Sequence, residues 1–149
     1  MATKRTNKQV VETFIQEVFV KHDFSLLDEL VRDDYLQHNP DVAQGKKGFL
    51  DFFKITFKAM PDFKYTPLKI VAEGDIVMAY CRNTATHTGG PWLDKAPTGN
   101  KLDFNVVDIF RIQDGKIAEH WDVADTFSLF KQVGIIDRLL KQDYQAGNK

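Results

Sequence analysis

Cysteine is almost absent from this sequence. Cys81 is the single cysteine among 149 residues, so an internal disulfide is excluded. It lies in an apolar segment, where a small buried side chain is the expected role. No apolar run reaches the roughly 18 residues of a membrane span. The polar residues 1–8 are not followed by the apolar stretch of a signal peptide. These absences predict a cytoplasmic protein that has no membrane partner.

Excess charge and recognised cofactor motifs are also missing. The sequence has 20 Lys and Arg against 21 Asp and Glu, a net charge of −1. The basic residues are scattered, which argues against binding to nucleic acid. No Gly-x-Ser-x-Gly elbow, phosphate loop, dinucleotide fingerprint or His-Glu-x-x-His spacing occurs. No metal site is therefore predicted.

The hydrophobic pattern changes period along the chain. Apolar residues at helical spacing predict helices over residues 7–21, 24–31 and 46–60, with a short extended piece over 33–40. The period then becomes two and predicts strands over 63–72, 76–88, 101–113 and 116–122. Turn residues at 73–75 and 113–115 predict two hairpins. Residues 89–100 form a long loop, and a last helix begins at Thr126, reaches about Gln142 and is interrupted by Gly134.

Helices followed by antiparallel strands indicate the α+β class. The length of 149 residues suits a single domain, with an ordered core over about 8–142. We expect the N-terminal helices to pack in the concave face of a curved, cone-shaped sheet. The open end of such a cone is a natural ligand cavity. A small hydrophobic molecule is the expected ligand.

Apolar residues occupy both faces of the predicted strands. Ile76, Met78 and Tyr80 alternate with Val77 and Ala79, for example. An antiparallel sheet with one wet face should instead alternate apolar and polar residues. The pattern predicts a homodimer formed through the sheet, with Trp121 on the outer face. Coverage of that face by the long loop or the C-terminal segment is the alternative.

Two short segments place titratable groups among apolar neighbours: residues 35–40 and 115–125. In the second, His120 and Asp122 share one face of a strand. A carboxylate on an apolar face is costly unless it is paired, hydrogen-bonded or used in function. Asp122 is the first candidate for a general base, because an apolar cavity raises the pKa of its carboxyl. Capping of the last helix, or pairing with a cation, is the alternative role.

Asp108 is the second candidate acid, because it shares a strand face with Phe104, Val106 and Phe110 unless a bulge turns it outward. His38 could shuttle a proton, and Asn39 could donate a hydrogen bond to an enolate oxygen. Both residues also suit a plain turn before Pro40. Further candidates for contact with a ligand, with packing as the alternative for each, are Tyr35, Phe53, Tyr80, His87, Trp92 and His120.

The order of elements, His38-Asn39-Pro40 and the ending Gly115-Lys116-Ile117-Ala118-Glu119-His120-Trp121-Asp122 carry a family resemblance. Over about residues 8–135 the chain resembles the nuclear-transport-factor-2-like superfamily, and within it the SnoaL-like polyketide cyclases. The resemblance implies a cone-shaped α+β barrel, usually dimeric, with no metal or organic cofactor. It also implies that Asp122 is the general acid/base. Ketosteroid isomerases of this fold carry a carboxylate where this sequence has Asn39, which argues against isomerase activity of that type.

Three functions are compatible with these residues. In the first, Asp122 removes a proton next to a carbonyl of an apolar compound, His38 and Asn39 stabilise the enolate, and an aldol cyclisation, isomerisation or lyase-like step follows. The second is a non-catalytic ligand-binding or dimerisation module, whose cone is sealed by some of the twelve phenylalanines. The third is an epoxide hydrolase, which needs an Asp-Arg-Asp set. Asp108 and Asp122 could supply its acids, but Arg111 has the opposite strand parity.

Overall fold

The computed structural model describes residues 4–136, 140 and 141. Within them, the N-terminal half contains α1 (Asn7–Phe14), a π-helical continuation η1 (Ile15–Val20), α2 (Leu27–Leu30), β1 (Val31–Gln37) and α3 (Gly45–Ala59). The second half contains β2 (Lys64–Glu73), β3 (Ile76–Thr86), β4 (Lys101–Gln113), β5 (Lys116–Ala124) and α4 (Thr126–Val133). The predicted α+β class is confirmed. None of the helices in the described part is long and apolar enough to cross a membrane.

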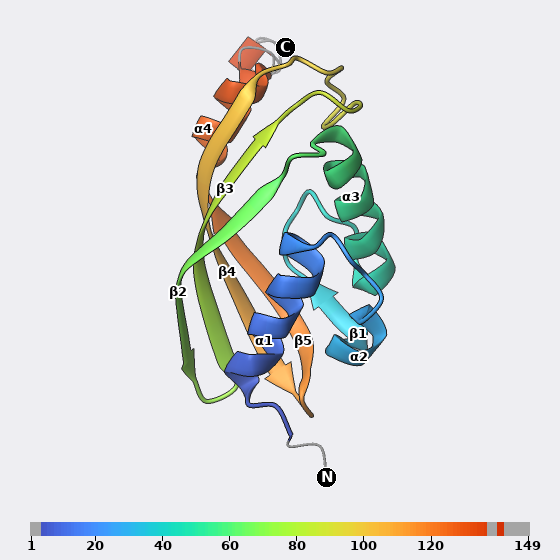
Figure 1. Ribbon diagram of the computed structural model, residues 1–149, viewed down its shortest axis with the longest axis vertical. Coiled ribbons are helices and arrows are strands. Elements are labelled where there is room, and N and C mark those ends of the chain that lie inside the picture. Colours follow the sequence, from blue (N-terminus) through green and yellow to red (C-terminus); the bar gives the residue numbers. More distant parts are fainter. Residues whose placement is uncertain (1–3, 137–139, 142–149) are drawn as a thin grey trace, which may run out of the picture.

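The five strands form one curved sheet in the order β1-β5-β4-β3-β2. Neighbouring strands are antiparallel except β1, which runs parallel to β5. Both predicted hairpins are present, and Gly74 and Gly115 take the positive φ angles that their tight turns require. Figure 1 shows the long strands curving past α1, with α3 on the far side of the helix from the sheet.

The closed part of the cone is filled by phenylalanine. Phe14 of α1 lies with its ring centroid 5.3 Å from Phe19, 5.6 Å from Phe49 of α3 and 5.7 Å from Phe110 of β4. These aromatic contacts join both helices to the concave face of the sheet. Helix α1 begins with a capping box. The Thr6 hydroxyl accepts a hydrogen bond from the backbone N–H of Gln9, and the Gln9 side-chain oxygen accepts one from the backbone N–H of Thr6.

One predicted helix is shorter in the structure, and the predicted break in another is present. The second helix covers Leu27–Leu30 only, because Val31 leaves it to pair with Ile117 and begin β1. The interruption predicted at Gly134 is confirmed: α4 ends at Val133, and Gly134 takes a left-handed conformation with φ of 83° and closes the helix with its amide. Beyond it, the described residues Ile136, Leu140 and Lys141 are helical again. The predicted extension to Gln142 falls partly on residues 137–139 and 142, which lie outside the described residues.

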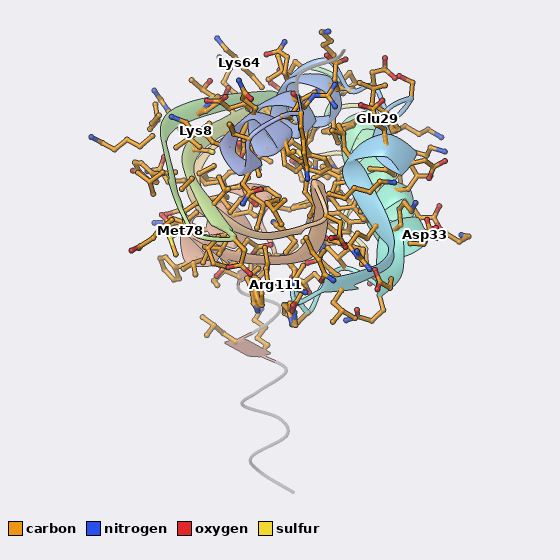
Figure 2. The ribbon with its side chains drawn as sticks, turned by 90° about the horizontal axis from the view of Figure 1, so that it is seen from below. Lys8, Glu29, Asp33, Lys64, Met78 and Arg111 are labelled. Atoms are coloured by element: carbon orange, nitrogen blue, oxygen red, sulfur yellow. The ribbon has the colours of Figure 1, made fainter. Side chains whose placement is uncertain are left out.

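The long strands have clearly different faces. Along β3, Val77, Ala79 and Cys81 are buried, whereas Met78 and Tyr80 are exposed. Figure 2 shows Met78 and Arg111 pointing away from the interior that the sheet encloses. Asp108 and Asp122 stand opposite each other across β4 and β5, and the next pair, Ile109 and Trp121, belongs to the outer face. The register therefore places the two acids on the inner side of the sheet.

Candidate active site

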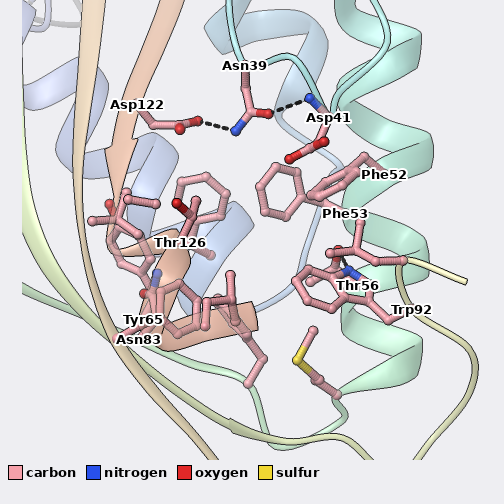
Figure 3. A pocket seen from close by; sticks show the side chains of 18 of the residues that line it. Asn39, Asp41, Phe52, Phe53, Thr56, Tyr65, Asn83, Trp92, Asp122 and Thr126 are labelled. Carbon is pink, nitrogen blue, oxygen red and sulfur yellow. Dashed lines mark hydrogen bonds between the residues drawn. The ribbon is translucent and has the colours of Figure 1, made fainter. Parts of the chain in front are cut away.

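A pocket lies between the inner face of the sheet, α3 and α4 (Figure 3). Its cavity volume is about 120 Å³ and it is partly open to solvent. That volume is similar to the ~150 Å³ of an engineered cavity that holds benzene. Its apolar walls are Phe19, Phe52, Phe53, Met60, Phe63, Trp92, Leu93, Phe104, Val106, Ala124, Leu129 and Phe130. Its polar lining is Asn39, Asp41, Thr56, Tyr65, Asn83, Asp122 and Thr126.

Asp122 is the titratable group that β5 presents to this pocket. Burial among apolar side chains raises the pKa of its carboxyl, and the nearby carboxylates of Asp108 and Asp41 raise it further. A hydrogen bond from Asn39 and the proximity of His120 act in the opposite direction. The Asp122 Oδ2 atom accepts from the Asn39 Nδ2 atom at 2.7 Å. Its Oδ1 atom has no hydrogen bond within the described residues, so one carboxylate oxygen is available to a ligand.

Asn39 is held in one orientation. Its Oδ1 atom accepts from the backbone amide of Asp41 at 2.8 Å, and a backbone N–H can only donate. The Asn39 Nδ2 group must therefore face Asp122, as Figure 3 shows. Asn39 thus holds the Asp122 carboxylate, while a second N–H on the same nitrogen is left for a ligand. The sequence indicated a polar residue here but not that it would pair with Asp122.

A buried hydrogen-bond network lies behind Asp122. The Gln37 Oε1 atom accepts from the backbone amides of His38 and Asn39, which fixes the orientation of the Gln37 carboxamide. The same oxygen lies 3.0 Å from His120 Nδ1, so that nitrogen must carry a proton. His120 Nε2 then meets Asp108 Oδ1 at 2.8 Å, and one proton is shared between this histidine and this carboxyl group.

Asp108 is satisfied on both oxygens. Tyr65 donates its hydroxyl to Asp108 Oδ2 at 2.6 Å and accepts from the Cys81 thiol at 2.8 Å. Burial raises the pKa of Cys81 to about 12, which keeps the thiol protonated and suits its role as a donor. Asp108 and His120 are 5% and 3% exposed and do not line the pocket, although they share its side of the sheet.

Asp108, His120 and Asp122 each offer an atom of a metal-binding type, and these atoms lie within 4.8 Å of one another. The sequence motifs predicted no metal site. In the structure, Asp108 and His120 are already bonded to each other and to Tyr65 and Gln37. These contacts account for Asp108 and His120, whereas Asp122 accepts its hydrogen bond from Asn39.

His38 lies outside the pocket, which corrects the prediction that it acts there beside Asn39. Its Nε2 atom bonds Glu119 at 2.8 Å, and its ring stacks on Trp121 with a centroid distance of 4.5 Å. Both partners belong to β5 positions that alternate with His120 and Asp122. Since the side chain of His38 is 38% exposed, it faces solvent on the outer side of the sheet.

The remaining candidates divide between the pocket and the scaffold. Phe53 and Trp92 line the pocket, and Trp92 donates its indole N–H to Thr56 at 3.0 Å. Tyr35 is buried and accepts from Gln37, away from the lining. Tyr80 lies on the exposed face of β3, so its predicted place in the pocket is wrong.

His87 is also absent from the lining. It is fully buried, and its Nε2 atom bonds the Gly90 carbonyl at 2.8 Å. A ring nitrogen that faces a carbonyl must donate, so His87 fixes the start of the long loop. The prediction that it contacts a ligand is therefore replaced by a structural role.

Sequence reasoning missed several polar groups of the pocket, among them Asp41, Asn83 and Thr126. Asn83 had a detectable signal, because it shares the strand parity of Val77, Ala79 and Cys81, as a polar residue on an apolar face. Asp41 and Thr126 gave no such signal, since Asp41 lies in a turn after β1 and Thr126 is the first residue of α4.

Known proteins resemble this chain in sequence and in structure. A family model described as SnoaL-like polyketide cyclase matches residues 9–133. TsrD from Streptomyces laurentii is similar in structure, with 29% identity and a TM-score of 0.77 over 87% of this chain and 95% of that one. No curated protein matched the chain.

Two further solved structures are similar at 26% identity. AclR from Streptomyces galilaeus, provisionally assigned as a hydroxylase, has a TM-score of 0.76 over 87% of this chain and 96% of that one. IdmH from Streptomyces antibioticus, provisionally assigned as a polyketide cyclase, has a TM-score of 0.71 over 87% of this chain and 99% of that one.

Proposed function

The chain belongs to the SnoaL-like polyketide cyclase family, and we propose that it is an enzyme that converts a flat carbonyl compound by proton transfer through Asp122. The observation that carries this proposal is the asymmetric environment of the Asp122 carboxylate. One oxygen is held by Asn39, and the other is without a hydrogen bond in the described structure and borders an aromatic pocket. A base that is oriented and partly desolvated in this way suits proton abstraction from carbon.

The proposed reaction begins when Asp122 Oδ1 takes a proton from the carbon next to a carbonyl. The C–H electron pair becomes the enolate, and the negative charge moves to the carbonyl oxygen, to which the second N–H of Asn39 can donate. The enolate carbon then attacks a second carbonyl of the same molecule and forms a C–C bond. Asp122 returns its proton to the new alkoxide, so the base is regenerated and no co-reactant is consumed.

The lining also limits the class of substrate. Among the described residues that border the pocket there is no lysine or arginine, and two are aspartates. A carboxylate or phosphate group on the ligand would therefore lack a partner. Aromatic walls favour a flat, apolar, uncharged molecule. The cyclase assignment of IdmH supports ring closure as the outcome. An epoxide hydrolase would need an arginine here, and Arg111 lies on the outer face with Glu119.

Exchange of deuterium into a simple ketone tests the proposal without knowledge of the natural substrate. The probe is 2-tetralone in deuterium oxide, and the incorporation at its C1 position is followed by NMR. We expect the protein to accelerate exchange and the Asp122→Asn variant to lose at least about a hundredfold of that acceleration. Asp103→Asn changes an exposed carboxylate that pairs with Arg82 and serves as the matched control.

Three outcomes would contradict the proposal. Binding of 2-tetralone without faster exchange would favour a ligand-binding module, the second function considered above. Full exchange activity of Asp122→Asn, together with loss of activity in His38→Gln, would indicate that the base is His38 on the outer face. Equal losses of exchange activity in Asp122→Asn and Asp103→Asn would indicate that both substitutions act by disturbing the fold.

A further inference from the structure

The loop of residues 87–100, between β3 and β4, contains a hairpin whose sequence does not suit its backbone. The backbone N–H groups of Trp92 and Lys95 each donate to the carbonyl oxygen of the other residue at 2.9 Å. Between them, Leu93 and Asp94 have φ angles of 48° and 58°. Two positive φ angles between paired residues are the pattern of a type I′ turn, which favours asparagine, aspartate and glycine. Leucine is therefore unexpected at its first position.

A second turn with two positive φ angles, between β4 and β5, has the usual residues. Asp114 and Gly115 occupy it with φ angles of 53° and 77°. Aspartate tolerates this conformation because its short polar side chain can bond the local backbone, and glycine has no Cβ atom to clash. Among the described non-glycine residues with positive φ, Leu93 is the only aliphatic one. Residues held in such conformations cluster at active sites and ligand clamps.

The side chain of Leu93 lines the pocket. It is partly buried and stands beside Trp92 in the same wall. Figure 3 shows Trp92 on the α3 side of the pocket, across from Asp122. Asp94, the next residue of the turn, is exposed and is not part of the lining. The turn thus presents its leucine to the cavity and its aspartate to solvent.

The loop is tied to α3, so this wall has a fixed position. Near the start of the loop, the Gly89 N–H donates to the carbonyl oxygen of Ala59, the last residue of α3, at 2.8 Å. Further along, the Trp92 indole N–H donates to Thr56 of the same helix at 3.0 Å. These two bonds flank the turn on one side and hold Leu93 at a constant place relative to the aromatic residues that α3 contributes to the pocket.

We propose that Leu93 is a specificity-determining residue that limits the length of the ligand that the pocket accepts. This inference rests on the proposed function, because it takes the pocket as the ligand site, but it concerns recognition and not proton transfer. A flat ketone whose carbonyl lies at Asp122 extends towards the wall that carries Leu93. A smaller side chain there would lengthen the cavity.

The test compares 2-tetralone with 3,4-dihydroanthracen-2(1H)-one, which adds one linearly fused ring at the end remote from the ketone. Dissociation constants are measured by equilibrium dialysis for the wild-type protein and for Leu93→Gly, since glycine adopts positive φ without strain. We expect the three-ring ketone to bind Leu93→Gly at least about tenfold more tightly than it binds the wild-type protein, because the added ring gains room and buries apolar surface. Binding of 2-tetralone should not improve, since it loses a contact.

Two further variants separate the leucine side chain from the flexibility of the turn. Asp94→Gly makes the same change at the adjacent position, outside the lining, and should keep the wild-type ratio of the two dissociation constants. Leu93→Met restores a large apolar side chain and should also keep that ratio. A leucine with a purely structural role would, on replacement by glycine, weaken the binding of both ketones together and leave their ratio unchanged.

The ratio is measured without turnover, so the outcomes distinguish this inference from the catalytic proposal. If Leu93→Gly leaves the ratio unchanged, the inference is wrong, even where the exchange of 2-tetralone depends on Asp122. Equal changes of the ratio in Leu93→Gly and Asp94→Gly would also overturn it, because the freedom of the turn would then set the ligand length. The expected change confined to Leu93→Gly, together with an absence of deuterium exchange, would support the inference while the catalytic proposal fails.

Discussion

The Asn39 carboxamide links two parts of the site that are far apart in sequence. Its Oδ1 atom accepts a hydrogen bond from the backbone N–H of Asp41, and its Nδ2 atom donates one to the Asp122 carboxylate. The second bond favours the ionised form of Asp122, and so lowers the pKa that burial raises. The pKa of the proposed base is therefore set mainly by a balance between desolvation and one hydrogen bond from a neighbouring loop.

Removal of this bond should be visible in the pH dependence of exchange. In Asn39→Ala the ionised carboxylate loses its donor, so the pKa of Asp122 rises further above the ordinary aspartate value. The base must be ionised to act, and the acid limb of kcat/KM for 2-tetralone exchange should therefore move to higher pH. A rate that falls equally at every pH, with the limb unmoved, would mean that Asn39 acts only through the shape of the pocket.

Sequence reasoning at this scale succeeded where strand parity decides the answer. Alternation along the strands predicted that Asp108 and Asp122 share the inner face and that Trp121 does not. It could not predict that Asp108 would be enclosed by Tyr65 and His120, because those contacts cross between strands. His38 was misplaced for a similar reason, since its partner Glu119 belongs to a strand 81 residues away in sequence.

At the scale of elements, the loop that carries Asn39 and Asp41 is fixed by its neighbours. Gln44 exchanges hydrogen bonds with the backbone of Gln37 and so holds both ends of the turn. Helix α3 then packs directly on it, because a Cβ atom added at Gly48 would lie 2.0 Å from the Ala43 carbonyl oxygen. Gly48 is therefore required by a close approach of helix and loop.

Substitution of Gly48 should reverse the usual effect of alanine in a helix. Gly→Ala in a helix interior normally stabilises by roughly 1 kcal/mol. Here Gly48→Ala must displace the loop, so we expect a loss of about 1–3 kcal/mol of unfolding free energy and slower 2-tetralone exchange. Denaturant unfolding and the exchange assay measure both effects. Gly90→Ala, where a Cβ would meet nothing within 4 Å, is the control. A Gly48→Ala protein as stable and active as this control would refute the argument.

Periodicity predicted the long strands and α3 well, because each buries one regular face. It failed at the boundary between α2 and β1. Leu27 and Leu30 continue a helical pattern, but Val31 is the first residue of β1 and pairs in parallel with β5. That pairing joins segments more than 80 residues apart in sequence. The hydrophobic pattern of residues 24–31 alone therefore cannot predict it.

At the scale of the whole molecule, the helices within the described residues pack on the concave face of the sheet, and the outer face exposes apolar side chains. The C-terminal segment, the alternative cover for that face, lies largely outside the described residues. Helices α1 and α3 pack against the inner side through Phe14 and Phe49, and α4 lines the pocket through Leu129 and Phe130. The long loop is joined to α3 by the hydrogen bond from Trp92 to Thr56. The outer face leaves several large apolar side chains in water, namely Leu68, Val71, Met78, Tyr80 and Val123. Exposed apolar residues gathered on one sheet face are typical of an interface.

We propose that a second copy of the chain covers this face with two-fold symmetry, as the pattern of the strands predicts. Light scattering at micromolar concentration should then give twice the monomer mass of 17.1 kDa. Val123→Glu places a charge on the outer face at a side chain that is 67% exposed, so it should shift the protein towards monomer without unfolding it. Ile55→Glu makes the same change on the exposed side of α3 and should leave the mass unchanged. A wild-type mass near that of the monomer would contradict the proposal and show that the outer face remains exposed to water. Equal dissociation of the Val123→Glu and Ile55→Glu variants would show that the dimer contact does not lie specifically on the outer face of the sheet.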